Sequence, residues 1–316
     1  MSGVLTAQIQ SRGDMAQFLN RIGKFDQGIV IKPNWTSGDY GFYTDAEAME
    51  LLLRELSGPI YVVESFMFGR TDGTIEIRPD NGREHWEWLR EQDKRFLAES
   101  GIGELLERYD AEYINVTEEW WSGRCMPEEE IRSRVESRYA PIRHKELYNG
   151  VPRRLYELRH LPFVSYAKFK YNDPDVSNFS SFSMKNVFGM IPVPNREFYH
   201  GADQDIGLSR SIIDIVSIYR SLFEMYGIVE GVYKIPVTRK DGENRYEMIW
   251  TEYDVIEDAG IIIGSQDLLT LDAYANKLVG IDPDTRAFLR FGSEVFGQWN
   301  REELSKITPS MKAIFR

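Results

Sequence analysis

A strand–helix–strand pattern near the N-terminus constrains the fold of this chain more than any other feature. The apolar run "GIVIKPN" (28–34) and the run "PIYVVES" (59–65) are both short and rich in β-branched residues, as strands covered on both faces are. Between them lies "TDAEAMELLLRELSG" (44–58), which starts with Thr44 or Asp45 as a helix cap and ends on a glycine. This order predicts a βαβ unit and therefore a parallel sheet.

The rest of the chain extends the same prediction. "FVSYAKFKYN", "IVEGVYKIP" and "GIIIGS" are strand-like, while "LSRSIIDIVSIYRSLFEMYG" and "QDLLTLDAYANKLVG" have helical periodicity. We expect an open, mainly parallel α/β sheet with helices on both faces. Residues 1–65 would form the first part of this core and residues 161–316 the second. The charged, tryptophan-rich segment 66–160 would be a helical insertion that caps a cleft and contributes tryptophans to its wall.

Charge and cysteine content exclude several classes of protein. A net charge of −12 argues against nucleic acid as a partner, although an acidic surface can surround a basic pocket. The single cysteine, Cys125, excludes an intramolecular disulfide and a cluster held by four cysteines. There is no signal-peptide pattern and no apolar run long enough to span a membrane. We therefore expect a cytoplasmic protein without a membrane partner; a homo-oligomer stays open.

Polar side chains follow five of the apolar runs. Because ligands gather at the carboxyl ends of strands in open α/β sheets, these residues are candidates for substrate binding. Each residue taken alone also fits a loop start or a helix cap, and Asp267 before "LLTLDAYA" fits an N-cap especially well. The candidates for a binding role are Lys32, Asn34, Lys168, Glu230 and Asp267, and Glu64 is a candidate for a catalytic role.

The stretch "SMKNVFGMIPVPNREFYHG" (183–201) supplies the candidates for chemistry. Lys185 sits among apolar residues, which would lower its pKa and allow it to act as a base, acid or nucleophile. His200 is its natural partner in proton transfer, and Asn186 is a candidate for substrate binding. Two prolines between Asn186 and His200 restrict the chain and favour holding both on one ligand. The alternative is a packing loop in which a carbonyl satisfies His200.

Cofactor motifs do not occur. The sequence has no HExxH, Walker A, GxGxxG or GxSxG pattern, so no cofactor is predicted. Magnesium is the alternative that carboxylates leave open, although their spacing does not specify a site. The acidic residues considered for it are Asp214, Glu230, Asp258, Asp267 and Asp272.

A set of motifs in this order resembles the bacterial and archaeal domain-of-unknown-function family 362. They are "GIVIKPNW", "TDAEAMELLLREL", "IYVVES", "SMKNVFGMIP", "YHG", "IVEG" and "GIIIGSQDLLTLDAYANKLVGI". The resemblance implies an α/β fold. It places the recurring polar positions of the family on Lys32, Asn34, Glu64, Lys185, Asn186, His200, Glu230, Asp267 and Asp272. Many members carry an added iron–sulfur segment, for which this chain lacks the cysteines.

The functional expectation is an enzyme of small-molecule, biosynthetic metabolism that acts on a small anionic substrate. Lys32 and Asn34 would hold a carboxylate or phosphate, and Lys185 and His200 would move protons in an isomerisation, elimination or addition. Glu64 would orient the lysines or a substrate hydroxyl. The alternative is a non-catalytic binding or maturation protein that holds an anionic metabolite with the same lysines.

Overall fold

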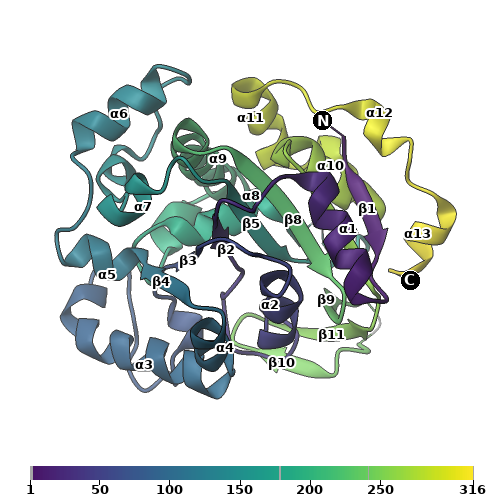
Figure 1. Ribbon diagram of the computed structural model, residues 1–316, viewed down its shortest axis with the longest axis horizontal. Helices are drawn as coiled ribbons and strands as arrows, with labels where there is room; N and C mark the ends of the chain where they lie inside the picture. The colour runs from purple at the N-terminus through teal and green to yellow at the C-terminus, as the bar shows by residue number, and fades with distance from the viewer. Residues whose placement is uncertain (1–2, 178, 241, 316) are drawn as a thin grey trace.

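A seven-stranded sheet runs through the centre of the molecule in the computed structural model, which describes residues 3–177, 179–240 and 242–315 (Figure 1). The strand order is β1-β12-β8-β5-β2-β3-β4. From β8 to β4 neighbouring strands are parallel, whereas β12 and β1 are added antiparallel. The strands are β1 (Leu5–Gln8), β2 (Ile29–Lys32), β3 (Ile60–Glu64), β4 (Ala111–Asn115), β5 (Phe163–Lys168), β8 (Met225–Gly231) and β12 (Ile261–Ser265).

Helices cover both faces of this sheet, so the expected α/β architecture is confirmed. On one face Ile31 and Val62 pack with residues of α1, α2, α3 and α4. On the other face Val30 and Val63 pack with α6, α7, α8 and α9. These helices are α1 (Arg12–Ile22), α2 (Ala46–Leu53), α3 (Trp86–Glu99), α4 (Ile102–Arg108), α6 (Glu128–Glu136), α7 (Arg153–Glu157), α8 (Ser183–Val187) and α9 (Gln204–Leu222).

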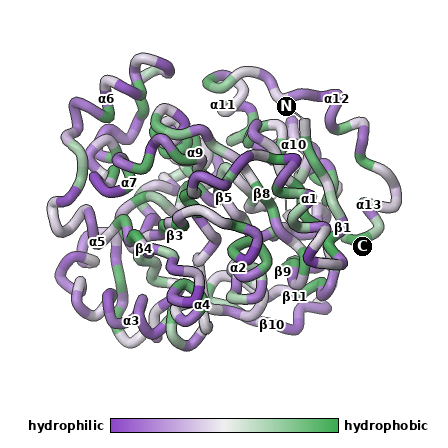
Figure 2. Tube along the Cα trace, in the orientation of Figure 1, coloured by the Kyte–Doolittle hydropathy of each residue, from purple (hydrophilic) through white to green (hydrophobic). Residues whose placement is uncertain are grey.

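Of the remaining helices, all but α5 lie toward the C-terminal end of the chain. Residues of α10 pack against β8 and β12, and Phe315 stacks on Phe169 near the end of the chain. Figure 2 shows apolar residues concentrated in the central strands and inner helices, with polar residues common in outer helices such as α3 and α6. The further helices are α5 (Val116–Trp121), α10 (Leu268–Leu278), α11 (Ala287–Phe296), α12 (Arg301–Leu304) and α13 (Pro309–Ala313).

A second sheet of five strands grows out of the first, in the order β10-β11-β9-β6-β7. The segment predicted as one strand at 163–172 breaks at Phe169 into β5 and β6, and the segment predicted at 228–236 breaks after Gly231 into β8 and β9. Both segments thereby pass from the main sheet into the second one. The strands of the second sheet are β6 (Lys170–Asn172), β7 (Ser180–Ser181), β9 (Lys234–Thr238), β10 (Tyr246–Met248) and β11 (Thr251–Glu257).

The segment 66–160 is largely helical, but it wraps around the edge of the main sheet. It supplies the edge strand β4, which pairs with β3, and its helices pack on both sheet faces. Several of its tryptophans pack against one another in a separate apolar cluster, with Trp86 and Trp121 in edge-to-face contact at 5.8 Å between ring centroids. Among the described helices, none is long and apolar enough to cross a membrane.

Candidate functional site

A cavity of about 610 Å³ lies where the main sheet meets the second sheet. It collects residues from the ends of β2 and β3, from the break between β5 and β6, from α8 and from the turn that follows it. Lys32, Asn34, Lys185, Asn186 and His200 all line it. These five residues, which the functional expectation places on one ligand, thus share one cavity, although 168 positions separate the first from the last.

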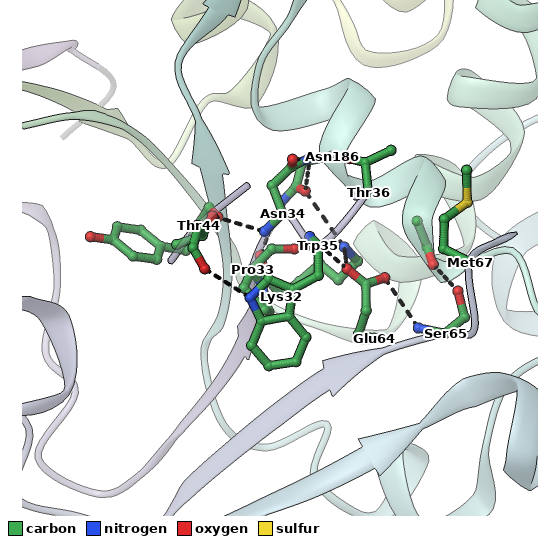
Figure 3. A network of polar contacts seen from close by, with 12 residues as sticks. Lys32, Pro33, Asn34, Trp35, Thr36, Thr44, Glu64, Ser65, Met67 and Asn186 are labelled. Carbon is green, nitrogen blue, oxygen red and sulfur yellow. Dashed lines mark hydrogen bonds and ion pairs between the residues drawn. The ribbon is translucent and has the colours of Figure 1, made fainter. Parts of the chain in front are cut away.

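The floor of the cavity is a closed polar network (Figure 3). Lys32 is 1% exposed, and its Nζ donates to Glu64 Oε2 at 2.8 Å and to the Pro33 carbonyl at 2.7 Å. Burial lowers the pKa of Lys32 to about 8, against the opposing effect of Glu64. Glu64 also accepts from the backbone N–H groups of Trp35 and Ser65 at 3.2 and 3.1 Å. The carboxylate is therefore fully occupied within the protein.

Two asparagines complete this network. Asn186 accepts from Asn34 Nδ2 at 3.1 Å on its Oδ1, and its Nδ2 donates to the Lys32 carbonyl at 2.8 Å and to Ser165 Oγ at 3.0 Å. Gly189 lies directly against the network, because a Cβ at this position would be 2.6 Å from Lys32 Nζ. A larger residue there would displace the ion pair, which explains the glycine in "NVFGM".

Asp272 fixes the short helix that presents Lys185 and Asn186. Its Oδ1 accepts from the backbone N–H and the hydroxyl of Ser183 at 2.9 and 2.5 Å, and its Oδ2 accepts from the Met184 N–H at 3.0 Å. Burial raises the pKa of Asp272 to about 7, although these hydrogen bonds lower it. The carboxylate thus accepts hydrogen bonds from N–H groups in the first turn of α8 that have no partner within the helix.

Three basic side chains line the cavity without an ion-pair partner among the described residues. No carboxylate of the described residues forms an ion pair with Lys170, Lys185 or Arg196, all of which line the cavity. Lys170 Nζ donates to Thr36 Oγ1 and the Phe42 carbonyl, both at 3.2 Å. Arg196 donates to Ser65 Oγ and to the carbonyls of Ile191, Phe66 and Gly189. These partners are all uncharged, and the carboxylate of Glu64 acts on Lys170 and Arg196 only from beyond ion-pair distance.

The electrostatic consequence is a set of lowered pKa values. Burial, with Lys185 and other lysines nearby, puts the pKa of Lys170 well below its ordinary value. Burial and then Arg196 lower the pKa of Lys185 to about 7. Burial, then Lys185 and Arg196, lower the pKa of His200 to about 4. The Phe188 ring contacts both groups, with Lys185 Nζ 4.4 Å and the His200 ring 5.7 Å from its centroid.

Three of the predicted site residues lie outside the cavity lining. Lys168 and Glu230 form a completely buried ion pair at 2.9 Å, at paired positions of β5 and β8. Asp267 caps α10 by accepting from the N–H groups of Leu269 and Thr270. It misses the cavity because β12 runs antiparallel to β8, so its carboxyl end points to the other edge of the sheet.

One further expectation needs correction, and the structure also bears on the residues of the magnesium alternative. The tryptophans of the cavity are Trp35 and Trp250 rather than those of the segment 66–160, from which only Met67 and Phe68 reach the lining. The five carboxylates considered for magnesium do not come together, since the described residues contain no group of three or more potential metal ligands. Asp214, for example, accepts the backbone N–H groups of Arg143 and His144 instead.

Sequence reasoning missed Lys170, Arg196 and Trp250 as lining residues. Lys170 lies in the strand-like segment 163–172, and it reaches the cavity because the break at Phe169 starts a new strand in the second sheet. Arg196 lies in the stretch 183–201 that supplied the other candidates, and its position between Asn186 and His200 was a usable signal. No local pattern in "EMIWTEY" indicates that Trp250 meets residues more than fifty positions earlier.

A comparison with protein-family models assigns the chain to a family. The family model described as "Domain of unknown function (DUF362)" matches residues 29–277. The chain belongs to this family. The match contains the floor network, α8 and the turn that carries Arg196 and His200, and every residue that lines the cavity falls within it.

The other comparisons add little to this assignment. No curated protein matches the chain. A crystal structure of a protein from Thermotoga maritima aligns with 10% sequence identity and a TM-score of 0.33, over 87% of this chain and 60% of the other. The chain thus spans well under two thirds of that protein.

Proposed function

We propose that this member of the family binds a small metabolite bearing a carboxylate or phosphate and moves a proton on it, in an isomerisation, elimination or addition. The single observation that carries the proposal is the cluster of Lys170, Lys185 and Arg196 facing one cavity without a carboxylate partner in the described residues. This cluster occurs in a protein whose net charge is −12.

Unpaired cations in a cavity are costly, because burial removes the water that stabilises their charge. A bound anion would offset this cost, since attraction between opposite charges is stronger in a partly desolvated site than in water. Arg196 supplies a fixed positive charge, because its Nε and Nη2 already donate to Ser65 and to backbone carbonyls, and the two lysines offer point charges. Lys32 is less suited to bind the anion directly, because Glu64, Pro33 and Asn186 already occupy its donors.

Lys185 is the group best matched to proton transfer. With a pKa of about 7 it exists as both amine and ammonium near neutral pH, which is the condition for an efficient general base or acid. His200, with a pKa of about 4, is neutral there and can accept a proton or orient the substrate. A bound anion would raise both pKa values, because negative charge favours the protonated forms. Glu64 would act through Lys32, as a positioning residue.

A non-catalytic binding protein is the second candidate, and one observation favours it. A catalytic acid or base works best when its pKa is close to the working pH, and the pKa of His200, lowered to about 4, lies well below neutral pH. Under this alternative Lys170, Lys185 and Arg196 hold the anion as fixed charges, and no bond of the ligand changes.

Hydrogen exchange in D₂O distinguishes the two candidates. A panel of small carboxylic and phosphorylated acids is incubated with the protein, and exchange of carbon-bound hydrogen is followed by NMR. We expect exchange in at least one acid, reduced by about 10²–10⁴-fold in His200→Ala, the usual contribution of a positioned acid or base. Lys185→Met should lose both exchange and binding, whereas Lys24→Met, an exposed lysine far from the cavity lining, should retain both.

Isothermal titration with the same acids supplies the second readout. Binding without exchange anywhere in the panel would favour the binding protein. Absence of binding for every acid, in a wild-type protein that unfolds cooperatively, would contradict the anion site itself.

A further inference from the structure

Aromatic side chains share the cavity with the three cations. Six line it, namely Trp35, Phe42, Phe68, Phe179, Phe188 and Trp250. They differ in exposure: Trp35 is 1% exposed and belongs to the floor, whereas Phe179 and Trp250 are 38% and 46% exposed and stand at the mouth. The cavity is therefore polar and cationic at depth and aromatic toward solvent.

The size of the cavity argues against a very small ligand. A volume of about 610 Å³ is within the range of sites that enclose drug-sized ligands. It equals the volume of about twenty water molecules at roughly 30 Å³ each, and inorganic phosphate or acetate, with about four or five non-hydrogen atoms, fills only a fraction of it. Additional atoms of the ligand would have to contact the aromatic walls.

Trp250 is placed to receive a flat group. It lies in the turn between β10 and β11, and its ring meets Phe68 edge-on, at 5.4 Å between centroids and 89° between planes. The ring packs directly on Gly69, where a Cβ would be 2.6 Å from it. An edge-on partner on one side and a large exposed fraction leave aromatic surface that a ligand ring can cover, and covering it removes apolar area from water.

We propose that the ligand joins a planar aromatic ring to a carboxylate or phosphate, with the ring against Trp250 and Phe68 and the anion on Lys185 and Arg196. This inference rests on the proposed function, whose site it shares. The ring could belong to a free aromatic acid or to a nucleotide, and both present a flat face and a negative charge.

Titration calorimetry with matched probes tests the two halves of the ligand separately. The probes are 2-naphthoate, the neutral naphthalene-2-methanol, acetate, inorganic phosphate and adenosine monophosphate. We expect 2-naphthoate or the nucleotide to bind at least tenfold more tightly than acetate or phosphate, and the neutral alcohol to bind more weakly than 2-naphthoate. Whichever of 2-naphthoate and adenosine monophosphate binds more tightly identifies the aromatic acid or the nucleotide as the source of the ring.

Trp250→Ala should weaken binding of the better aromatic anion by about tenfold, as loss of an aromatic contact commonly does. It should leave acetate and phosphate unchanged. Ile249→Ala is the matched control, because Ile249 lies in the same turn and is 69% exposed but does not line the cavity; this variant should bind all probes like the wild type.

The outcomes separate this inference from the proposed function. Two results would overturn the aromatic part of the ligand while anion binding stands. One is that acetate or phosphate binds as tightly as the aromatic anions. The other is that Trp250→Ala binds the aromatic anions as tightly as the wild type does. If naphthalene-2-methanol equals 2-naphthoate, the anionic half is overturned. If no anionic probe binds, the proposed function fails as well.

Discussion

Replacing Asp272 by asparagine should change the stability of this protein in a way that depends strongly on pH. Asp272 is completely buried on α10, and its two carboxylate oxygens hold the first turn of α8 through Ser183 and Met184. Burial raises its pKa from 3.8 to about 7. The Asp272 side chain therefore holds α8 in place, but ionising it in the folded protein near neutral pH costs free energy.

Two opposing terms set the magnitude. Asparagine turns an NH₂ group toward a backbone N–H that the carboxylate had satisfied, which costs about 1–3 kcal/mol for a buried donor without an acceptor. It also removes the cost of charging, since a pKa raised from 3.8 to about 7 corresponds to about 4 kcal/mol at roughly 1.4 kcal/mol per unit.

The sign of the pH dependence follows from linkage. Because the folded-state pKa of Asp272 is raised, its stabilising contribution is complete below about pH 4 and declines as the pH rises to about 7. Asp272→Asn lacks this decline. We expect the variant to be less stable than the wild type at pH 4 and equal or more stable at pH 7.5.

Urea denaturation at pH 4, 5.5 and 7.5, followed by circular dichroism, measures this crossing. Asp267→Asn is the control, because Asp267 caps the same helix and asparagine is an equally good N-cap; its effect on the free energy of unfolding should be small. A difference between Asp272→Asn and wild type that stays constant from pH 4 to 7.5 would refute the reasoning.

Two further predictions concern the cavity. Gly189→Ala should lower the free energy of unfolding by about 1–3 kcal/mol, because its methyl group would overpack the buried ion pair of Lys32. Gly13→Ala, in the exposed first turn of α1, should instead stabilise slightly by helix propensity, and equal losses in urea denaturation would contradict the packing argument. Competitive acetylation at pH 7.5, read by peptide mass spectrometry, should modify Lys185 at least tenfold faster than exposed Lys24, because with a pKa of about 7 Lys185 is mostly unprotonated; an equal rate would count against the lowered pKa.

The sequence predicts the parallel core of the fold well, because its signals are local. The βαβ unit at β2, α2 and β3 has continuous apolar strands and a capped helix, and each forms where the pattern indicates. The edge strand β4 has the sequence "AEYIN", in which half-exposed charged and aromatic residues give no continuous apolar run. The breaks at Phe169 and after Gly231 also escape detection, since the apolar pattern continues across them while the partner strands change.

The positions of the site residues were predictable where the strands belong to the parallel unit, and not where the direction of a strand or its partner had to be known. Lys32 and Glu64 end up together because parallel strands present their carboxyl ends at one edge, and α8 brings Asn186 to the same place. Asp267 follows an equally apolar strand, but the direction of β12 depends on which neighbour it pairs with, and composition does not encode this choice. Lys168 shows the same limit, because a fully buried partner on β8 captures its ammonium group.

The turn between β10 and β11 forms one part of the cavity wall, and the ends of β2 and β3 with α8 form the other. Met248, Tyr253 and Val255 form a small apolar cluster with Phe42, separate from the clusters that support the main sheet. Residues 246–251 supply Met248, Trp250 and Thr251 to the cavity, whereas β2, β3 and α8 supply the residues of its polar floor. A chimera that receives this hairpin from another member should acquire that member's preference for the distal portion of the ligand, with the cationic end unaltered. Within one family, selectivity would then drift faster than chemistry.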